Sequence, residues 1–188
     1  MQEHGYKDLA YLYDLFYQKK EYLKEASFIK EICAEHHVKT ILDIGCGTGK
    51  HMHLLEKEGF ACTGIDINEE MLKIAKTRVK GELVHADMST FALDKKFDAI
   101  MLMFAVFNYI SDEKQAKQML TNAKHHLKSN GILILDLHNS SKSGSKREQY
   151  GERERIMEWN YDPNTRIEET KIIFNINNER IQDKHLLK

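Results

Sequence analysis

Three alternating glycines are the residues of this sequence whose spacing is best suited to holding a small ligand. Gly45, Gly47 and Gly49 lie in the segment DIGCGTG at positions 43–49. Glycines at alternate positions permit positive φ angles and let a ligand approach backbone amides at the start of a helix. The segment lacks the GxGxxG spacing of dinucleotide-binding loops and the Lys-Ser/Thr pair of a P-loop. Its two interpretations are a ligand-binding loop and a tight turn without a ligand.

Acidic residues follow the next two predicted strands. Asp66 comes 17 residues after Gly49, at a strand end where a carboxylate can accept hydrogen bonds from both hydroxyls of a ribose. Asp87 follows the third strand, where it can accept from the exocyclic amine of adenine while Met88 offers a backbone amide and an apolar face. Each acid alone has an alternative interpretation as a turn or loop residue. Together with the glycines they favour a nucleoside ligand.

Short apolar segments alternate with helical patterns through most of the chain. The predicted strands are residues 39–44, 60–65, 82–85, 97–104 and 132–137, the last preceded by a turn at 129–131. Three helices are predicted at residues 6–18, 21–36 and 50–57. A fourth begins at the N-cap Asn68, and a fifth runs from Ser111 to about Lys128. This alternation predicts a doubly wound, mostly parallel, Rossmann-like α/β sheet. The glycines and acids then meet at the carboxyl edge of the sheet.

The last quarter of the chain has a different pattern. Residues 139–154 are polar and rich in serine, so we expect a mobile loop or lid there. Residues 155–161, 166–177 and 180–186 read as an appended antiparallel β-meander, with Ile172, Phe174 and Ile176 on one buried face. The predicted organisation is a core at 1–138 that includes a helical cap at 1–37, the loop at 139–154, and a substrate or auxiliary region at 155–188.

The glycine loop, Asp66 and Asp87, in this order, resemble the cofactor motifs of class I S-adenosylmethionine-dependent methyltransferases, over about residues 6–138. The resemblance implies S-adenosylmethionine as the cofactor. The glycines would contact its methionine and ribose parts, Asp66 its ribose, and Asp87 with Met88 its adenine, while Met103 would flank the sulfonium. The complete set of cofactor-binding positions that we predict is Tyr13, Tyr22, Asp43, Gly45, Gly47, Gly49, Asp66, Ile67, Asp87, Met88 and Met103.

A closer resemblance is to the N-methyltransferases of nucleotide-linked amino sugars. It is carried by YDLFY at 13–17, KEY at 20–22, the loop at 45–55, Asp87-Met88, residues 103–110, TRIE at 165–168 and DKHLL at 183–187. It implies transfer of a methyl group to a small-molecule amine, an amino sugar among the candidates. The tryptophan-rich segment of that family is replaced here by Leu137-His138-Asn139. Only five of the seven strands of the family sheet precede the meander, so the C-terminal strands of the fold are expected to be missing.

Methyl transfer requires a neutral amine, alignment with the sulfonium and exclusion of water. Tyr13, Asn108, Tyr109 and His138 fall at the predicted edge, and each is a candidate to orient an amine or accept its proton. The alternative is a packing role for Tyr13 and an ordinary polar role for His138. O- or C-methylation of a small metabolite, a non-catalytic S-adenosylmethionine-binding domain and a nicotinamide dehydrogenase also remain open.

Composition limits the other classes of partner. The formal net charge is −1, from 28 basic and 29 acidic residues, so nothing in the overall charge attracts nucleic acid or an anionic membrane. Pro163 is the only proline, which rules out the Asn/Asp-Pro-Pro-Tyr/Phe element of enzymes that methylate nucleobase amines. No apolar run approaches the about 20 residues that cross a bilayer. Three cysteines without a CxxC pair fit a reducing, cytoplasmic setting, and no metal site is expected. A homodimer remains open.

Overall fold

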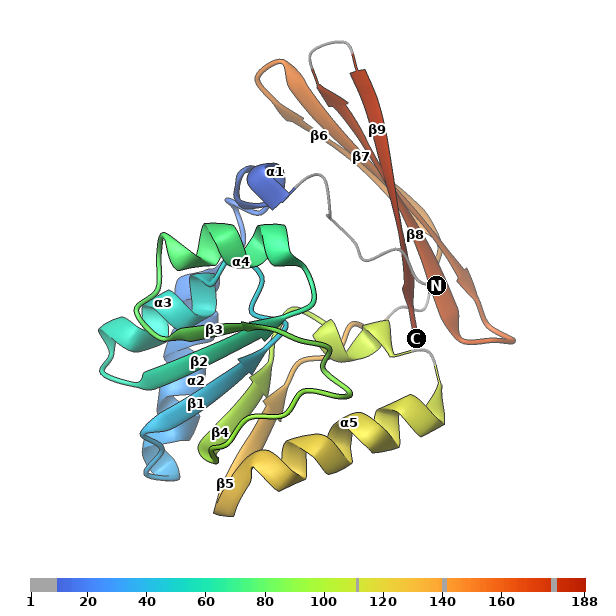
Figure 1. Ribbon diagram of the computed structural model, residues 1–188. Helices are drawn as coiled ribbons and strands as arrows, with labels where there is room; N and C mark the ends of the chain where they lie inside the picture. The colour runs from blue at the N-terminus through green and yellow to red at the C-terminus, as the bar shows by residue number, and fades with distance from the viewer. Residues whose placement is uncertain (1–9, 111, 140–141, 177–178) are drawn as a thin grey trace.

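The computed structural model describes residues 10–110, 112–139, 142–176 and 179–188, which form two sheets (Figure 1). The first sheet has five parallel strands in the order β3-β2-β1-β4-β5. Its strands are β1 (Thr40–Ile44), β2 (Ala61–Asp66), β3 (Glu82–His85), β4 (Phe97–Leu102) and β5 (Leu127–Leu135). The order reverses between β1 and β4, and in open α/β sheets ligands bind at the carboxyl ends of the strands beside such a reversal. The predicted α/β fold is therefore confirmed.

Helices cover both faces of this sheet. On one face, α2 (Tyr22–Glu35) and α3 (Lys50–Lys57) pack with alternate residues of β1 and β4 into one apolar cluster. On the other face, α5 (Glu113–His126) packs against the intervening residues of the same strands. Burial on both sides explains the nearly continuous apolarity of β1 and β4. No helix in the described parts of the chain combines the length and apolarity needed to span a bilayer.

Helix α4 (Glu69–Lys76) begins at the predicted cap. The side chain of Asn68 accepts hydrogen bonds from the amides of Glu70 and Met71, at 3.0 and 3.2 Å. These bonds satisfy two of the amides that a helix N-terminus leaves without a partner. The predicted cap of α5, Ser111, lies outside the described residues, and the side chain of Asp112 accepts from the amide of Gln115 there.

The second sheet is an antiparallel meander in the order β6-β7-β8-β9. Its strands are β6 (Gly144–Tyr150), β7 (Arg153–Asp162), β8 (Ile167–Ile176) and β9 (Glu179–Leu187). One apolar cluster joins the buried side chains of β8 to helix α1 (Ala10–Phe16) and to α4. Figure 1 shows α1 between α4 and this sheet. The N-terminal helix therefore links the two sheets, and the part of it predicted before residue 10 lies outside the described residues.

Three sequence-based expectations were wrong in detail. Within the predicted loop at 139–154, residues 144–150 form β6, whose polar side chains are mostly exposed and whose backbone pairs with β7. An exposed edge strand needs no apolar alternation, so its composition resembles that of a loop. The predicted turn at 129–131 lies inside β5 and not before it. Pairing breaks between Leu127, opposite Phe97, and Ile132, opposite Ala99, and Asn130 has a φ of 65° there. Strand β4 ends at Leu102, earlier than predicted, because the next residues turn into left-handed backbone.

Candidate active site

The three glycines of the loop after β1 all have positive φ, at 71°, 54° and 75°, but they have different surroundings. A Cβ added to Gly45 would lie 2.7 Å from both γ-carbons of Val106, and one on Gly49 would lie 2.9 Å from Val79 Cγ1. A Cβ on Gly47 would meet no atom within 4 Å. Gly45 and Gly49 therefore let other parts of the chain pack closely, whereas Gly47 leaves open space above bare backbone.

Asp66, at the end of β2, holds this loop through its carboxylate. Its Oδ2 accepts a hydrogen bond from the amide of Gly47 at 2.8 Å, and its Oδ1 accepts from the amide of Asn68 at 2.8 Å. Burial raises the pKa of Asp66, and these backbone hydrogen bonds partly offset the rise. A carboxylate offers about four lone-pair positions, so Asp66 retains capacity for donors on a ligand.

Asp43, in β1, is a buried carboxyl group beside the same loop. Its side chain is 2% exposed, and its Oδ2 has no hydrogen-bond partner among the described residues. Burial raises the pKa of Asp43 well above its ordinary value, and the negative charge of Asp66 adds to the rise. A buried polar atom without a partner costs free energy, so this oxygen is suited to a ligand that brings a donor or a positive charge.

The next residues along the edge follow β2 and β3. Asp87 forms a turn in which its Oδ1 accepts from the amide of Ser89 at 2.7 Å. Met88 beside it is half-buried against the apolar cluster under α5. The carbonyl of Ile67 lies 2.9 Å from Nε2 of His85. Asp87 is therefore a turn residue through Oδ1. Its Oδ2 does not take part in the hydrogen bond to Ser89, so the structure is also compatible with an adenine-binding role for Asp87.

An ion-pair cluster fixes α1 beside the glycine loop. Asp14 accepts a hydrogen bond from Thr48 Oγ1 at 2.7 Å, pairs with Arg78 and lies 3.5 Å from Lys50 Nζ. Although burial opposes it, hydrogen bonds from Thr48 and Arg78 lower the pKa of Asp14. The carboxylate therefore stays charged and keeps the aromatic residues of α1 over the loop.

Tyrosines from α1, the segment after it, α2 and η1 lie close to one another beside this loop, and two of them, Tyr13 and Tyr109, lie near Asp66. The rings of Tyr13 and Tyr17 lie 4.7 Å apart between centroids, and the Tyr13 hydroxyl hydrogen-bonds with that of Tyr22. Burial, followed by the neighbouring tyrosines and Asp66, raises the pKa of Tyr13 well above its ordinary value. The electrostatic neighbours of Tyr13 include Tyr109, so both tyrosine candidates of the sequence analysis meet at the edge.

The segment after β4 has strained backbone. Phe104 and Ala105 have φ angles of 67° and 59°, a left-handed conformation that disfavours residues with a side chain. The amide of Ala105 donates to Asp136 Oδ1 at 2.6 Å, which ties the segment to the end of β5. The segment then enters the short helix η1 (Val106–Tyr109). The sequence analysis missed Asp136, although an acid directly after a parallel strand is the same signal that identified Asp66.

Asn108 and His138 lie where β5 leaves the sheet. Asn108 is 6% exposed, its Oδ1 accepts from the amide of His138 at 2.9 Å, and its Nδ2 donates to the carbonyls of His138 and Lys188 at 3.1 and 2.8 Å. These bonds join η1, the end of β5 and the end of β9. His138 Nε2 lies 3.3 Å from Glu168 Oε2. Asn108 therefore braces the site in this structure, and His138 faces a carboxylate of the meander.

Comparison with known proteins identifies this arrangement. Residues 41–131 match the family model described as "Methyltransferase domain". The chain is 31% identical over 134 residues to dTDP-3-amino-3,4,6-trideoxy-alpha-D-glucopyranose N,N-dimethyltransferase of Streptomyces venezuelae, covering 69% of this chain and 56% of that protein. Its structure is similar to that of an S-adenosylmethionine-dependent methyltransferase from Clostridium acetobutylicum, with a TM-score of 0.82, 25% identity and coverage of 97% and 81%.

A second solved structure, DesVI of Streptomyces venezuelae, gives a TM-score of 0.81 at 25% identity and covers 95% of this chain and 83% of that one. The chain belongs to the class I S-adenosylmethionine-dependent methyltransferases. S-adenosylmethionine is accordingly its cofactor. The chain spans a little over half the length of the curated relatives it matches, at 59% and 56%.

The residues of this methyltransferase fit the cofactor. The open face of Gly47 leaves room for a ligand against the backbone, Asp66 has acceptor capacity for two hydroxyls, and the orphan oxygen of Asp43 suits an ammonium group. Met103, which we predict to flank the sulfonium, is 8% exposed and belongs to the apolar cluster beneath α2 and α3. Phe104, which contacts Tyr17 at 4.9 Å between ring centroids, is the residue of that segment that turns toward α1.

Cofactor binding by the methyltransferase is expected to release a proton at Asp43. Because burial raises the pKa of Asp43, its native carboxyl group binds a proton more readily than an unfolded one, and its contribution to stability falls as pH rises above about 4. An ammonium placed beside it favours the charged form and expels the proton. Isothermal titration calorimetry in two buffers of different ionisation enthalpy measures this release, and Asp43→Asn should abolish it. Equal binding heats in both buffers for the wild type would contradict the assignment.

Ala105→Gly is expected to leave the methyltransferase as stable as the wild type or to stabilise it by up to about 1 kcal/mol. The left-handed conformation costs alanine about 1–2 kcal/mol of folding free energy, and glycine avoids this cost. Glycine also makes the unfolded chain more flexible, which offsets part of the gain in stability. The control is Ala34→Gly, at an exposed position in α2, which should lose about 0.5–1 kcal/mol. Urea unfolding of both variants gives the comparison. A loss for Ala105→Gly equal to that of the control would show that the backbone there is not strained.

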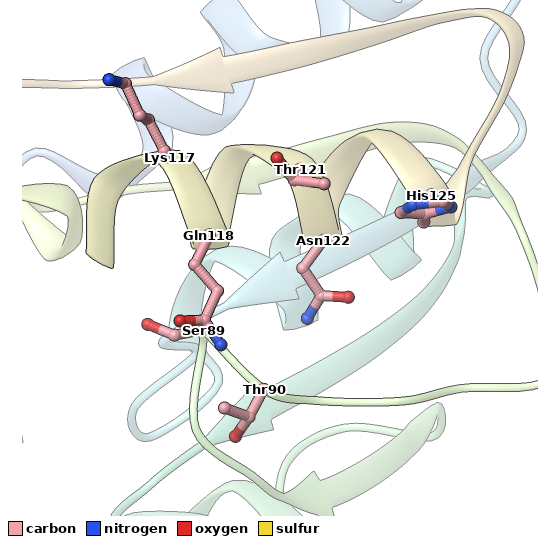
Figure 2. A pocket seen from close by; sticks show the side chains of 7 residues that line it. All are labelled: Ser89, Thr90, Lys117, Gln118, Thr121, Asn122 and His125. Carbon is pink, nitrogen blue, oxygen red and sulfur yellow. The ribbon is translucent and has the colours of Figure 1, made fainter. Parts of the chain in front are cut away.

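A polar groove of about 370 Å³ lies elsewhere on the surface, between α5 and the loop after β3 (Figure 2). It is lined by Ser89, Thr90, Lys117, Gln118, Thr121, Asn122 and His125. None of the site residues predicted from the sequence lines it. Its lining residue Ser89 donates its amide hydrogen bond to Asp87, so the groove begins directly beside that predicted site residue.

Proposed function

We propose that this chain transfers a methyl group from S-adenosylmethionine to an amino group of a small molecule, and that the acceptor is a nucleotide-linked amino sugar. The observation that carries the proposal is the meeting of two sets of side chains at one sheet edge. The glycine loop and Asp66 lie on one side, and Tyr109, His138 and the meander residue Glu168 lie on the other. The Streptomyces venezuelae relative bears the name of an amino-sugar N,N-dimethyltransferase, which supports this choice of acceptor.

Different residues of the chain bind the cofactor, exclude water and orient the acceptor amine. S-adenosylmethionine supplies a methyl group made electrophilic by the sulfonium. Asp66 and Asp43 bind the cofactor and fix its orientation, which converts a bimolecular step into an intramolecular one. Tyr13 of α1 and Tyr17, which follows it, cover the loop and exclude water. Tyr109 orients the acceptor amine, whose nitrogen needs a free electron pair to form the new N–C bond as the S–C bond breaks.

Cofactor choice is tested by titrating the protein separately with S-adenosylmethionine and NAD. Binding of S-adenosylmethionine alone is expected, since the GxGxG spacing does not match dinucleotide-binding loops. Binding of NAD alone would favour the dehydrogenase interpretation and overturn the proposal.

Acceptor choice is tested with radiolabelled S-adenosylmethionine and two matched nucleotide sugars. The first probe is dTDP-3-amino-3,6-dideoxy-alpha-D-glucopyranose, and the second carries a hydroxyl in place of its amino group. Label is expected in the first probe only. Label in the second would favour O-methylation. Cofactor binding without transfer to either probe, or to a wider panel of amines, would overturn the proposed acceptor and favour a non-catalytic domain.

A further inference from the structure

A pair formed by the half-buried Tyr109 and the buried His185 joins the parallel sheet to the meander. The hydroxyl of Tyr109, in η1, lies 2.7 Å from Nδ1 of His185, in β9. Their rings lie 5.7 Å apart between centroids at an interplanar angle of 60°. His185 is 4% exposed, so this contact is shielded from water. The two residues are 76 positions apart in the chain, and the hydrogen bond forms only when the meander docks.

The second nitrogen of His185 faces a carboxylate. Nε2 of His185 lies 3.2 Å from Oδ2 of Asp183, whose side chain is 11% exposed. Asp183 also accepts a hydrogen bond from the amide of Lys184 at 2.8 Å. The negative charge of a carboxylate favours a proton on the ring nitrogen nearest to it, and the other nitrogen of a neutral imidazole can then accept a hydrogen bond. Nδ1 is therefore placed to accept the Tyr109 proton.

Other charged and titratable groups surround this pair. Tyr17, Asp183 and Asp66 raise the pKa of Tyr109 after the larger effect of burial. On the meander face that carries His185, Thr170 is its partner in β8 and donates to Glu168 at 2.7 Å. Glu168 in turn faces His138. The groups that surround the pair are thus Tyr13 and Tyr17 near α1, Asp66 after β2, His138 after β5, Glu168 in β8 and Asp183 in β9.

We propose that Tyr109, His185 and Asp183 form a proton relay that prepares the acceptor amine for methylation. This inference rests on the proposed function. Tyr109 is the catalytic residue that touches the amine, and His185 and Asp183 are positioning residues that act through it. The raised pKa of Tyr109 supports a relay, because such a tyrosine gives up its proton only if a neighbouring base takes it at the same time.

The proton moves through these groups in balanced steps, with water as its final acceptor. An N–H bond of the acceptor ammonium breaks while an O–H bond forms on Tyr109, and the electron pair stays on the acceptor nitrogen. The original O–H bond of Tyr109 breaks while an N–H bond forms on Nδ1 of His185. The resulting imidazolium is balanced by the carboxylate of Asp183. The methylated product leaves as an ammonium, and the proton on His185 then passes back through Tyr109 to water.

The test combines kinetics with the protonation state of His185. With dTDP-3-amino-3,6-dideoxy-alpha-D-glucopyranose as probe, kcat of the wild type should rise with pH through one ionisation. His185→Gln keeps a hydrogen-bonding side chain but cannot titrate, so it should lower kcat at least about 100-fold and remove this rise. Its dissociation constant for S-adenosylmethionine should stay within twofold of the wild-type value. Asp183→Asn should also lower kcat, because the imidazolium that the relay forms loses its carboxylate partner.

Two results would overturn the relay. The first is a kcat of His185→Gln that lies within threefold of the wild-type value and has the same pH profile. This result would mean that His185 only helps the meander to pack against η1. The other comes from ¹⁵N NMR, which should show Nδ1 of neutral His185 without a proton in the wild type and an altered titration in Tyr109→Phe. A proton on Nδ1 would exclude the relay even if no probe were methylated. His36→Gln, at an exposed position after α2, is the matched control and should change neither readout.

Discussion

Asp66→Ala should weaken the binding of S-adenosylmethionine by about 100-fold or more. The carboxylate is expected to accept two hydrogen bonds from ribose, and a hydrogen bond to a charged group contributes about 1.5–3 kcal/mol. The same oxygens hold the amides of Gly47 and Asn68, so the loop loses its support as well. Isothermal titration calorimetry measures the affinity. Asp66→Asn, which keeps the size and one acceptor, should lose less.

The control for this prediction is Asp94→Ala, which removes an exposed acid from the loop before β4. It should bind S-adenosylmethionine as the wild type does, and it excludes a general effect of one lost negative charge. An affinity for Asp66→Ala within threefold of the wild type would contradict the assignment of the ribose site. Thermal unfolding of Asp66→Ala should be measured alongside, since a folded variant is needed for the comparison.

Gly47→Ala should abolish measurable cofactor binding while leaving a folded protein. A Cβ at this position meets no protein atom within 4 Å, so the cost to the protein is the left-handed backbone alone, about 1–2 kcal/mol. The added methyl group would occupy the open space that we assign to the cofactor. Calorimetric titration and urea unfolding separate the two effects.

Gly151→Ala is the matched control for this second prediction. Gly151 has a φ of 63°, and a Cβ there likewise meets nothing within 4 Å, but it lies in the turn between β6 and β7. The two variants should lose similar stability, and only Gly47→Ala should lose affinity. Cofactor binding by Gly47→Ala at wild-type strength would place the cofactor away from Gly47.

Much of the fold could be predicted because its signals are local. The apolar runs of β1 and β4 mark strands covered on both faces, and Asn68 marks the start of α4 by its capping side chain. The glycine loop and Asp66 follow from the rule that ligands bind at the carboxyl edge. Strand β6 could not be predicted, since its exposed polar side chains follow no pattern and its partner is chosen by backbone pairing.

The site was less predictable than the sheet, because its side chains take their roles from partners far away in the sequence. Asn108 was selected as a candidate base or orienting group, yet its amide is engaged with the backbone of His138 and Lys188. His185 stood in a motif without an assigned role, and only the docked meander brings it to Tyr109. A position at the carboxyl edge of the parallel sheet predicts that a residue lies near the site. Its hydrogen-bond partners depend on tertiary contacts that the sequence pattern does not reveal.

Helix α1 depends for its packing on strands that lie far from it in the sequence. The seven residues of α1 are too few to form a stable helix alone in water. The ring of Phe16 packs 4.8 Å from that of Phe174, and Tyr150 donates a hydrogen bond to the carbonyl of Phe16 at 3.0 Å. During synthesis these partners leave the ribosome long after α1 does. Helix α1 therefore gains its apolar partners in the meander only after β8 has been translated, whereas the partners of Asp14, which are Thr48, Arg78 and Lys50, are available earlier.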